Sequence, residues 1–179
     1  SRQLSLYAKH YPKLAPKATF IPFGNDVDYF TPKEMAMKKQ ILTFGKAKRD
    51  NDTLCKAFSG IADKKGYKLV VVGAGALKEK YPDGDIEFLD PMPLKDLVTL
   101  SRESAFIVVP LPEYLYSYGQ MSFLQSMALG KALIVTETTS SADYISDAPG
   151  VERVQPYDVG DMKAALQRMM ASDFATLQQ

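Results

Sequence analysis

Two basic residues, Lys46 and Arg49, follow Gly45 and the apolar run 41–44. An ammonium and a guanidinium at this spacing can hold phosphate oxygens, and arginine can do so through two parallel hydrogen bonds. Further along, Gly119 opens a stretch with the pattern of a helix, whose first N–H groups attract anions. These features favour a site for a pyrophosphate, although an arbitrary basic run is more commonly a solvated loop. The predicted phosphate-binding residues are Gly45, Lys46, Arg49, Gly119, Gln120 and Met121.

Short apolar runs alternate with amphipathic stretches along the chain, which is typical of a parallel sheet with helices between its strands. Most runs are continuously apolar, as expected of strands that are buried on both faces. The pattern predicts a doubly wound, Rossmann-like α/β sheet whose ligands bind beyond the carboxyl ends of the strands. The predicted strands are 19–23, 41–44, 68–72, 86–89, 106–109, 133–135 and 151–154. The predicted helices are 52–64, 77–80, 94–101, 120–129, 142–146 and 161–170.

The length and the charge of the chain limit the functions that it can have. Its 179 residues make one domain of ordinary size, and we expect a fragment because the chain begins inside polar, helix-like sequence. A net charge of +1, with acids and bases interspersed, argues against nucleic acid or an anionic membrane as the main partner, and no apolar run is long enough to span a membrane. The single cysteine, Cys55, fits a reducing compartment and is expected to be buried and inert. The single histidine, His10, leaves too few ligands for a metal cluster or a Ser/His/Asp triad.

The segment from Gly119 to Lys131, which ends in Gln-Ser-Met-Ala-Leu-Gly-Lys, resembles the signature region of the family-4 retaining glycosyltransferases. In that family the segment reads Glu-Ala-Met-Ala-x-Gly-Lys and belongs to the carboxyl-terminal, donor-binding lobe of the GT-B fold. Other pieces are similar in the same order: residues 21–32 to the family's Ile-Pro-Asn-Gly-Val-Asp segment, and residues 41–50 to its strand and basic loop. The resemblance extends over most of the chain and therefore indicates the fold and the lobe more strongly than the donor or the acceptor.

This resemblance implies a lobe that binds a nucleoside-diphosphate sugar, needs no metal or other cofactor, and works with an amino-terminal acceptor lobe that the chain lacks. Residues 1–17 would be a leading helix and connector from that missing lobe, and residues 18–179 the nucleotide-sugar-binding domain. The enzyme would transfer a hexose-type sugar, with retention, to a glycan, lipid or small-molecule acceptor. It would act in the cytoplasm, with any contact to the inner face of a membrane made by the missing lobe. The fragment alone would bind its donor without turnover.

The same resemblance implies roles for individual residues. Lys46 and Arg49 are expected to act in catalysis by stabilising negative charge on the leaving phosphate. Gln125 and Ser117 stand where the family has two glutamates and are the expected ribose-binding residues, because a glutamine can still accept a hydrogen bond from a ribose hydroxyl. Glu113, in a loop that looks longer than usual, is either the acid that replaces Ser117 in catalysis or an exposed loop residue. The residues where the family holds the nucleobase are Leu89, Asp90, Pro91 and Met92.

The replacement of both family acids leaves two other classes of function open. One is a catalytically degenerate scaffold or regulatory module, and the other is an enzyme of the same architecture, such as a nucleotide-sugar epimerase. The intact pair of Lys46 and Arg49 favours catalysis over a scaffold. Gly73 and Gly75 follow a strand but lack the third glycine of a dinucleotide fingerprint, so a tight turn is the favoured interpretation there.

Overall fold

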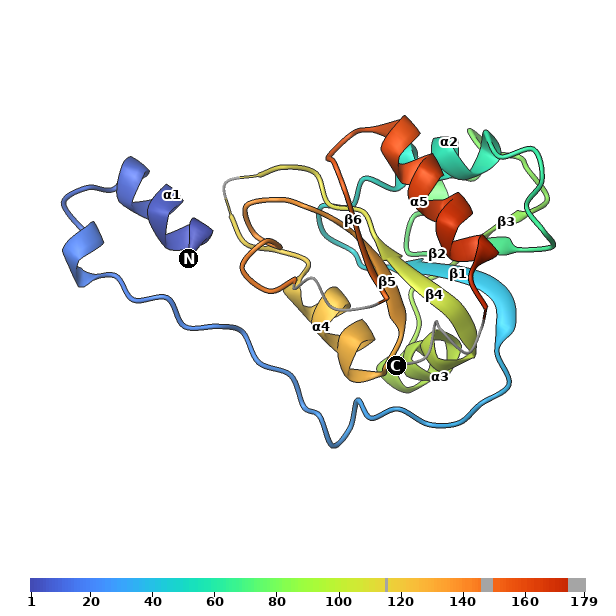
Figure 1. Cartoon of the computed structure of the whole chain (residues 1–179), viewed down its shortest axis with the longest axis horizontal. Helices are drawn as coiled ribbons and strands as arrows, with labels where there is room; N and C mark the ends of the chain where they lie inside the picture. Colours follow the sequence, from blue (N-terminus) through green and yellow to red (C-terminus); the bar gives the residue numbers. More distant parts are fainter. Residues whose placement is uncertain (115, 146–149, 174–179) are drawn as a thin grey trace.

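The computed structural model, shown in Figure 1, describes residues 1–114, 116–145 and 150–173 of the chain. Within this part, six strands form one sheet, accompanied by five α-helices and two short 3₁₀ helices. The strands are β1 (Lys38–Phe44), β2 (Lys68–Val72), β3 (Ile86–Leu89), β4 (Ser104–Val109), β5 (Ala132–Thr136) and β6 (Val151–Val154). The helices are α1 (Arg2–His10), η1 (Ala15–Lys17), α2 (Asn51–Ser59), η2 (Gly75–Leu77), α3 (Leu94–Glu103), α4 (Gln120–Ala128) and α5 (Val159–Ala171).

Every neighbouring pair of strands is parallel, and the order across the sheet is β3-β2-β1-β4-β5-β6. The predicted doubly wound, Rossmann-like sheet is therefore confirmed. The winding reverses between β1 and β4, and open sheets of this kind bind ligands in the crevice beyond that point. The loops after these two strands are tied together, because the Asp50 backbone N–H donates to the Pro110 carbonyl at 3.0 Å.

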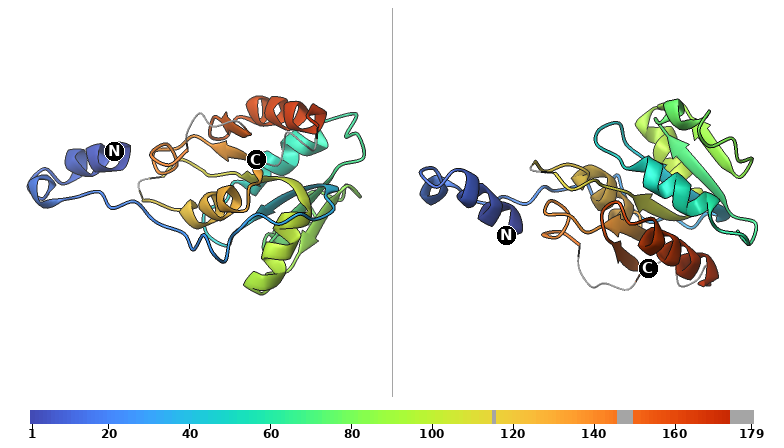
Figure 2. Two further views of the ribbon diagram at one scale, coloured as in Figure 1. Left: turned by 60° about the horizontal axis from the view of Figure 1, so that its bottom comes forward. Right: turned by 90° about the horizontal axis from the view of Figure 1, so that it is seen from above.

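The two faces of the sheet carry separate hydrophobic cores, because successive side chains of a strand point to opposite faces. Ile41 and Phe106 belong to the core covered by α2 and α5, whereas Leu42 and Val109 belong to the core covered by α3 and α4. Figures 1 and 2 show these two pairs of helices on opposite sides of the sheet. Cys55 is fully buried in the first core, and burial raises the pKa of its thiol to about 12, so the expectation of a buried, inert cysteine is confirmed.

The segment between η1 and β1 differs from its prediction. The predicted strand 19–23 is wrong, because the chain is irregular there and pairs with no strand among the described residues. Ile21 is 81% exposed, and the Phe23 N–H donates to the Tyr144 hydroxyl at 3.0 Å instead of to a neighbouring strand. Apolar side chains alone do not make a strand when its backbone groups lack a partner. In Figure 1, α1 lies to one side of the layered body, and the segment runs from there along the body to β1.

Three predicted helices differ from the observed ones for local reasons. The helix predicted over 52–64 ends at Ser59, because the chain turns at Gly60 and brings Ile61 into the core. The helix predicted over 77–80 is replaced by the short η2, which begins two residues earlier. Residues 142–144 form turns, Ile145 follows without regular structure, and the last residue of that predicted helix, Ser146, lies outside the described residues.

Lys131 precedes β5 and is only 5% exposed. Its ammonium donates to the Arg102 carbonyl at 2.9 Å and contacts the Met37 sulfur at 3.4 Å. Burial lowers the pKa of Lys131 to about 8. A lysine of the unfolded chain titrates at about 10.4, so between these two values the unfolded state binds more protons than the folded state. The free energy of unfolding should therefore rise with pH across this window.

We expect Lys131→Met to abolish that rise. Wild type should gain about 3 kcal/mol relative to the variant between pH 8 and 10.4, because the folded state no longer bears the cost of a buried charge. Urea unfolding at both ends of the window measures the difference. The matched control is Lys68→Met at an exposed position, which should follow wild type at every pH. Parallel pH profiles for wild type and Lys131→Met would contradict the prediction.

Candidate functional site

A cavity of about 970 Å³ opens at the carboxyl ends of β1 and β4, where the winding of the sheet reverses. Segments far apart in sequence meet there: the loop after β1, the first turn of α4 with the residues before it, the start of α3, and the segment before β1. Sites for small molecules commonly measure about 300–1,000 Å³. All six residues predicted to bind phosphate line the cavity, together with Ser117 and Gln125. The other lining residues are Gln3, Ile21, Pro22, Phe23, Gly24, Phe44, Ala47, Leu94, Leu97, Tyr118, Ser122 and Tyr144.

Arg49 joins the loop after β1 to the first turn of α4. Its Nε donates to the Phe44 carbonyl at 3.2 Å, its Nη1 to the Ala47 carbonyl at 2.8 Å, and its Nη2 to the Ser122 hydroxyl at 2.7 Å. Burial lowers the pKa of the guanidinium to about 10, which leaves it charged at neutral pH. No carboxylate of the described residues pairs with it. A partly buried cation without a counter-charge favours the binding of an anion.

Gly45 makes room for this guanidinium. Its φ is +127°, and a Cβ added at this position would lie 2.7 Å from both Cζ and Nε of Arg49. Any side chain here would push the guanidinium away from Ser122. The glycine in front of the two basic residues is therefore required by close packing as well as by backbone conformation.

The start of α4 presents free N–H groups to the same cavity. Its N-cap, Gly119, has φ +85° and provides no side-chain cap. The N–H groups of Gly119, Gln120 and Met121 have no acceptor within the described part of the chain, whereas the Ser122 N–H donates to the Gly119 carbonyl at 3.0 Å. Lys46 lines the cavity with its ammonium exposed and makes no side-chain contact with a described residue that would hold it in place. The wall thus combines two cations with the positive end of a helix.

Two glutamines, Gln120 and Gln125, complete the polar part of the cavity wall. Gln120 and Gln125 are 9% and 7% exposed, and their side-chain amides form no hydrogen bond with the described residues. Neither amide is among the fully buried polar atoms that lack a partner in the described part of the chain, so both reach the open space of the cavity, where a ligand or water would bind them. Among the described residues that line the cavity there is no Asp or Glu. The electrostatic potential of the wall is therefore set by Lys46 and Arg49.

Two sets of predicted site residues, Glu113 and residues 89–92, are not part of the described lining of this cavity. The Glu113 carboxylate accepts hydrogen bonds from the Thr139 backbone N–H at 3.2 and 3.3 Å, so it supports the loop after β5. Residues 89–92 lie at the end of β3, and Leu94 and Leu97 of α3, a few positions further on, face the cavity in their place. The roles suggested for Glu113 and for residues 89–92 stay predictions.

Sequence reasoning missed several residues that build the wall. Ser122 could have been found from the sequence, because it lies in the first turn of the predicted helix 120–129, where a hydroxyl can contact a ligand bound at the helix N-terminus. Nothing in the sequence near Gln3 or Tyr144 indicates a place in this cavity, because only tertiary contacts bring these two residues there. The Gln3 amide donates to the Ser140 carbonyl at 2.9 Å, and the Tyr144 hydroxyl accepts from the Phe23 N–H.

The part of the chain that the structure describes offers neither a metal-binding cluster nor a membrane span. It contains no group of three or more His, Cys, Asp or Glu side chains that could hold a metal ion. None of its helices has the length and apolar character that crossing a bilayer requires.

The strand order, together with a cation-lined cavity at the point where the winding reverses, defines a Rossmann-like α/β domain suited to phosphate-bearing ligands. Residues 38–172 match the family described as Glycosyl transferases group 1, and the chain belongs to this family. The comparison with curated proteins finds no match.

Solved structures of GT-B glycosyltransferases share the fold. Sucrose-phosphate synthase from Thermosynechococcus elongatus is similar with a TM-score of 0.78 and 20% identity, over 99% of this chain and 49% of that chain. The C-terminal domain of a glycosyl transferase group 1 family protein from Francisella tularensis has a TM-score of 0.70 and 16% identity, over 87% and 92%. HepE from Anabaena, in complex with UDP and glucose, has a TM-score of 0.72 and 11% identity, over 91% and 50%. This chain spans about half the length of sucrose-phosphate synthase and of HepE.

Proposed function

We propose that the cavity binds the diphosphate of a nucleoside-diphosphate sugar, and that the chain is the carboxyl-terminal, donor-binding lobe of a family-4 retaining glycosyltransferase. The observation that supports this most directly is the cavity wall, where Arg49, Lys46 and the unpaired N–H groups of α4 meet. A diphosphate is an anion with several acceptor oxygens, and these groups offer it two cations and a row of hydrogen-bond donors.

The same groups suit the chemistry of sugar transfer. The bond between the anomeric carbon and a phosphate oxygen breaks, and its electron pair stays on that oxygen. Arg49, which its hydrogen bonds hold in one place, would stabilise the new charge without having to reorganise. Lys46 has a free side chain and would follow the phosphate as the charge develops. Both residues would then act in the catalytic step itself.

The rest of the donor would be recognised by neutral groups. We assign the ribose hydroxyls to Gln125, whose amide lines the cavity and has no partner among the described residues, and the transferred sugar to Ser117 and Gln120. The base would lie toward residues 89–92 and the first turn of α3. Glu113 would have to leave the Thr139 N–H before it could take part in transfer.

The remaining elements of the proposal concern the whole protein. An amino-terminal lobe would supply most of the acceptor site, since the chain spans about half of its GT-B neighbours. Residues 1–17 would belong to the connection between the lobes. Binding would need no metal, because the cations of the wall take over the neutralising role of a divalent ion. The transfer of a hexose-type sugar to a glycan, lipid or small molecule, in the cytoplasm, completes the proposal.

Calorimetric titration of the chain with UDP, GDP and ADP, each with and without Mg²⁺, tests the proposal. UDP is the first probe because it is present in the Anabaena structure. We expect one diphosphate to bind in the micromolar range with the same affinity in the presence and absence of the metal. A folded chain that binds none of them would contradict the assignment of the site, and binding only with Mg²⁺ would contradict its metal independence.

A second candidate is a non-catalytic module of the same fold. It is favoured by one observation, the absence of Asp and Glu from the described lining of the cavity. Such a module would give no heat with any diphosphate, whereas the donor lobe would bind one of them. Gln125→Glu separates the cases further, because an added carboxylate should change nucleotide affinity only if the ribose lies against this residue.

A further inference from the structure

A second cavity, of about 550 Å³, adjoins the first and shares Gln3 and Ser117 with it. One wall is the inward face of α1, the opposite wall is the loop after β4, and the short stretch 18–20 and the loop after β5 close the sides. Its size is also in the range of small-molecule sites. None of the functions proposed above uses this cavity.

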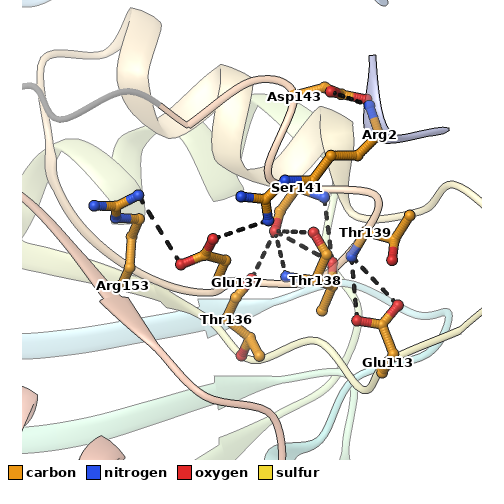
Figure 3. Close-up of polar contacts among 9 residues, drawn as sticks. All are labelled: Arg2, Glu113, Thr136, Glu137, Thr138, Thr139, Ser141, Asp143 and Arg153. Carbon is orange, nitrogen blue, oxygen red and sulfur yellow. Dashed lines mark hydrogen bonds and ion pairs between the residues drawn. The ribbon is translucent and has the colours of Figure 1, made fainter. Parts of the chain in front are cut away.

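The loop after β5 holds α1 in position, as Figure 3 shows. Asp143 accepts hydrogen bonds from the Arg2 N–H at 2.7 Å and from the Gln3 N–H at 3.0 Å, so its carboxylate caps the start of the helix. Glu137 pairs with Arg2 at 3.0 Å, and the Gln3 amide donates to the Ser140 carbonyl. The wall that α1 provides is therefore attached through its first turn, next to the shared residue Gln3.

Hydrogen bonds within the loop after β5, and from Glu113, hold this loop in place (Figure 3). The Ser141 hydroxyl donates to the Thr136 carbonyl at 2.7 Å and accepts from the Thr138 N–H at 2.9 Å. Glu113, from the loop after β4, accepts from the Thr139 N–H. The loops after β4 and β5 are thus joined, and the sides of the cavity are fixed relative to each other.

The lining of the second cavity is aromatic and uncharged. Tyr7 and Tyr11 come from α1 with their ring centroids 5.1 Å apart, and Tyr114 and Tyr116 come from the other wall with theirs 5.9 Å apart. Phe20 adds a fifth ring. Apart from His10, the polar groups of its described lining are hydroxyls and one amide, and that lining includes no Asp, Glu, Lys or Arg.

We propose that the second cavity binds an uncharged sugar ring of the acceptor, the molecule that receives the transferred sugar. Tyrosine faces pack against the apolar face of a pyranose, and hydroxyls and an amide can bind its equatorial hydroxyl groups. Apart from His10, no acidic or basic side chain belongs to the described lining, and the nearby Lys48 ammonium lies over the Tyr114 ring at 4.5 Å, so a phosphate or carboxylate would bind at the cations of the neighbouring cavity instead. This inference rests on the proposed function, because Gln3 and Ser117 place the occupant beside the transferred sugar only if the first cavity holds the donor.

The experiment uses the complete 179-residue chain, which has ten tyrosines and no tryptophan, so tyrosine fluorescence reports on its rings. The probes are methyl α-glucopyranoside and maltose, titrated with and without saturating UDP, and methyl glucuronoside serves as the charged comparison. We expect both neutral probes to bind in the millimolar range and the glucuronoside to bind more weakly.

Two variants, Tyr7→Leu and Tyr116→Leu, remove one ring from each wall. Each should weaken the neutral probes by roughly fivefold or more while leaving UDP affinity unchanged. The matched control is Tyr29→Leu, because Tyr29 is 44% exposed, packs edge-to-face against Phe30 and lines neither cavity. Tyr116 is 67% exposed, so its replacement should leave the fold intact even if that of Tyr7 does not.

The outcomes separate this inference from the proposed function. If UDP binds but neither neutral probe does, or if both variants bind the probes as wild type does, the inference is overturned and the donor site stands. If the probes bind through Tyr7 and Tyr116 but no diphosphate binds, a sugar site exists and its role as acceptor site is overturned. Tighter binding of the glucuronoside than of the neutral probes would also overturn it.

Discussion

Replacement of Arg49 by lysine is expected to weaken diphosphate binding by about 100-fold or more, although the positive charge is kept. An ammonium cannot reproduce the planar fork that reaches the Phe44 carbonyl and the Ser122 hydroxyl at once. The lysine ammonium would reach either the Phe44 carbonyl or the Ser122 hydroxyl and leave the other without its hydrogen bond. The N–H donors of this wall would then no longer be arranged to bind phosphate oxygens. Losing a buried, charge-assisted contact of this kind costs about 3 kcal/mol, which corresponds to about 100-fold in the dissociation constant.

Calorimetric titration with the diphosphate that wild type binds best measures the change. The control is Lys48→Met, which removes a neighbouring cation whose ammonium lies over the Tyr114 ring at 4.5 Å and outside the lining of the first cavity. Circular dichroism checks that both variants are folded, because Arg49 also joins two loops. An Arg49→Lys variant that is folded and binds within a few-fold of wild type would show that the guanidinium is only a structural tie. Equal losses in both variants would indicate general electrostatic attraction in place of a defined site.

The fold could be predicted because most of its strands contain continuous apolar runs, and turn residues or charges lie between them. The bounds of β2, β3 and β6 coincide with the predicted ones, since each is a short run whose ends are clear in the sequence. The prediction failed for 19–23, where an apolar run has no neighbouring strand among the described residues to pair with. Periodicity reports how a side chain is buried, but a strand also needs partners for its backbone, and only the tertiary structure supplies those.

Only those residues of the candidate site that stand at the ends of predicted strands or helices could be predicted from the sequence. Gly45, Arg49 and Gly119 stand at the ends of predicted elements, so the topology rule was enough to bring them together. The amide of Gln3 could not be expected there, because it reaches the cavity through the attachment of α1 to a loop some 140 positions away, with Gln3 and Asp143 in direct contact. The assignment of residues 89–92 came from the family resemblance and stays a prediction, and the described lining has Leu94 and Leu97 of α3 at this side of the cavity.

The second large effect is expected at Gly119, where alanine should destabilise the fold and abolish diphosphate binding together. The residue has φ +85°, a conformation that costs an ordinary residue about 1–2 kcal/mol. A Cβ added there would lie 2.6 and 2.9 Å from the two methyl carbons of Leu111. Leu111 is fully buried and its N–H donates to the Thr136 hydroxyl at 3.0 Å, so it cannot move aside cheaply. Overpacking of this kind adds about 1–3 kcal/mol.

Because the strain falls on the residue that begins α4, it should turn the N–H groups of Gln120 and Met121 away from the cavity, and binding should be lost along with stability. Urea unfolding and UDP titration measure the two effects, and Gly75→Ala, where an added Cβ meets nothing within 4 Å, is the matched control. The double variant Gly119→Ala/Leu111→Ala separates the causes, since it removes the clash and keeps the unfavourable φ. It should be less destabilised than the sum of the single variants, because the two residues interact directly. Strict additivity would show that the clash is absent, and full UDP affinity in a folded Gly119→Ala variant would show that the start of α4 does not bind the diphosphate.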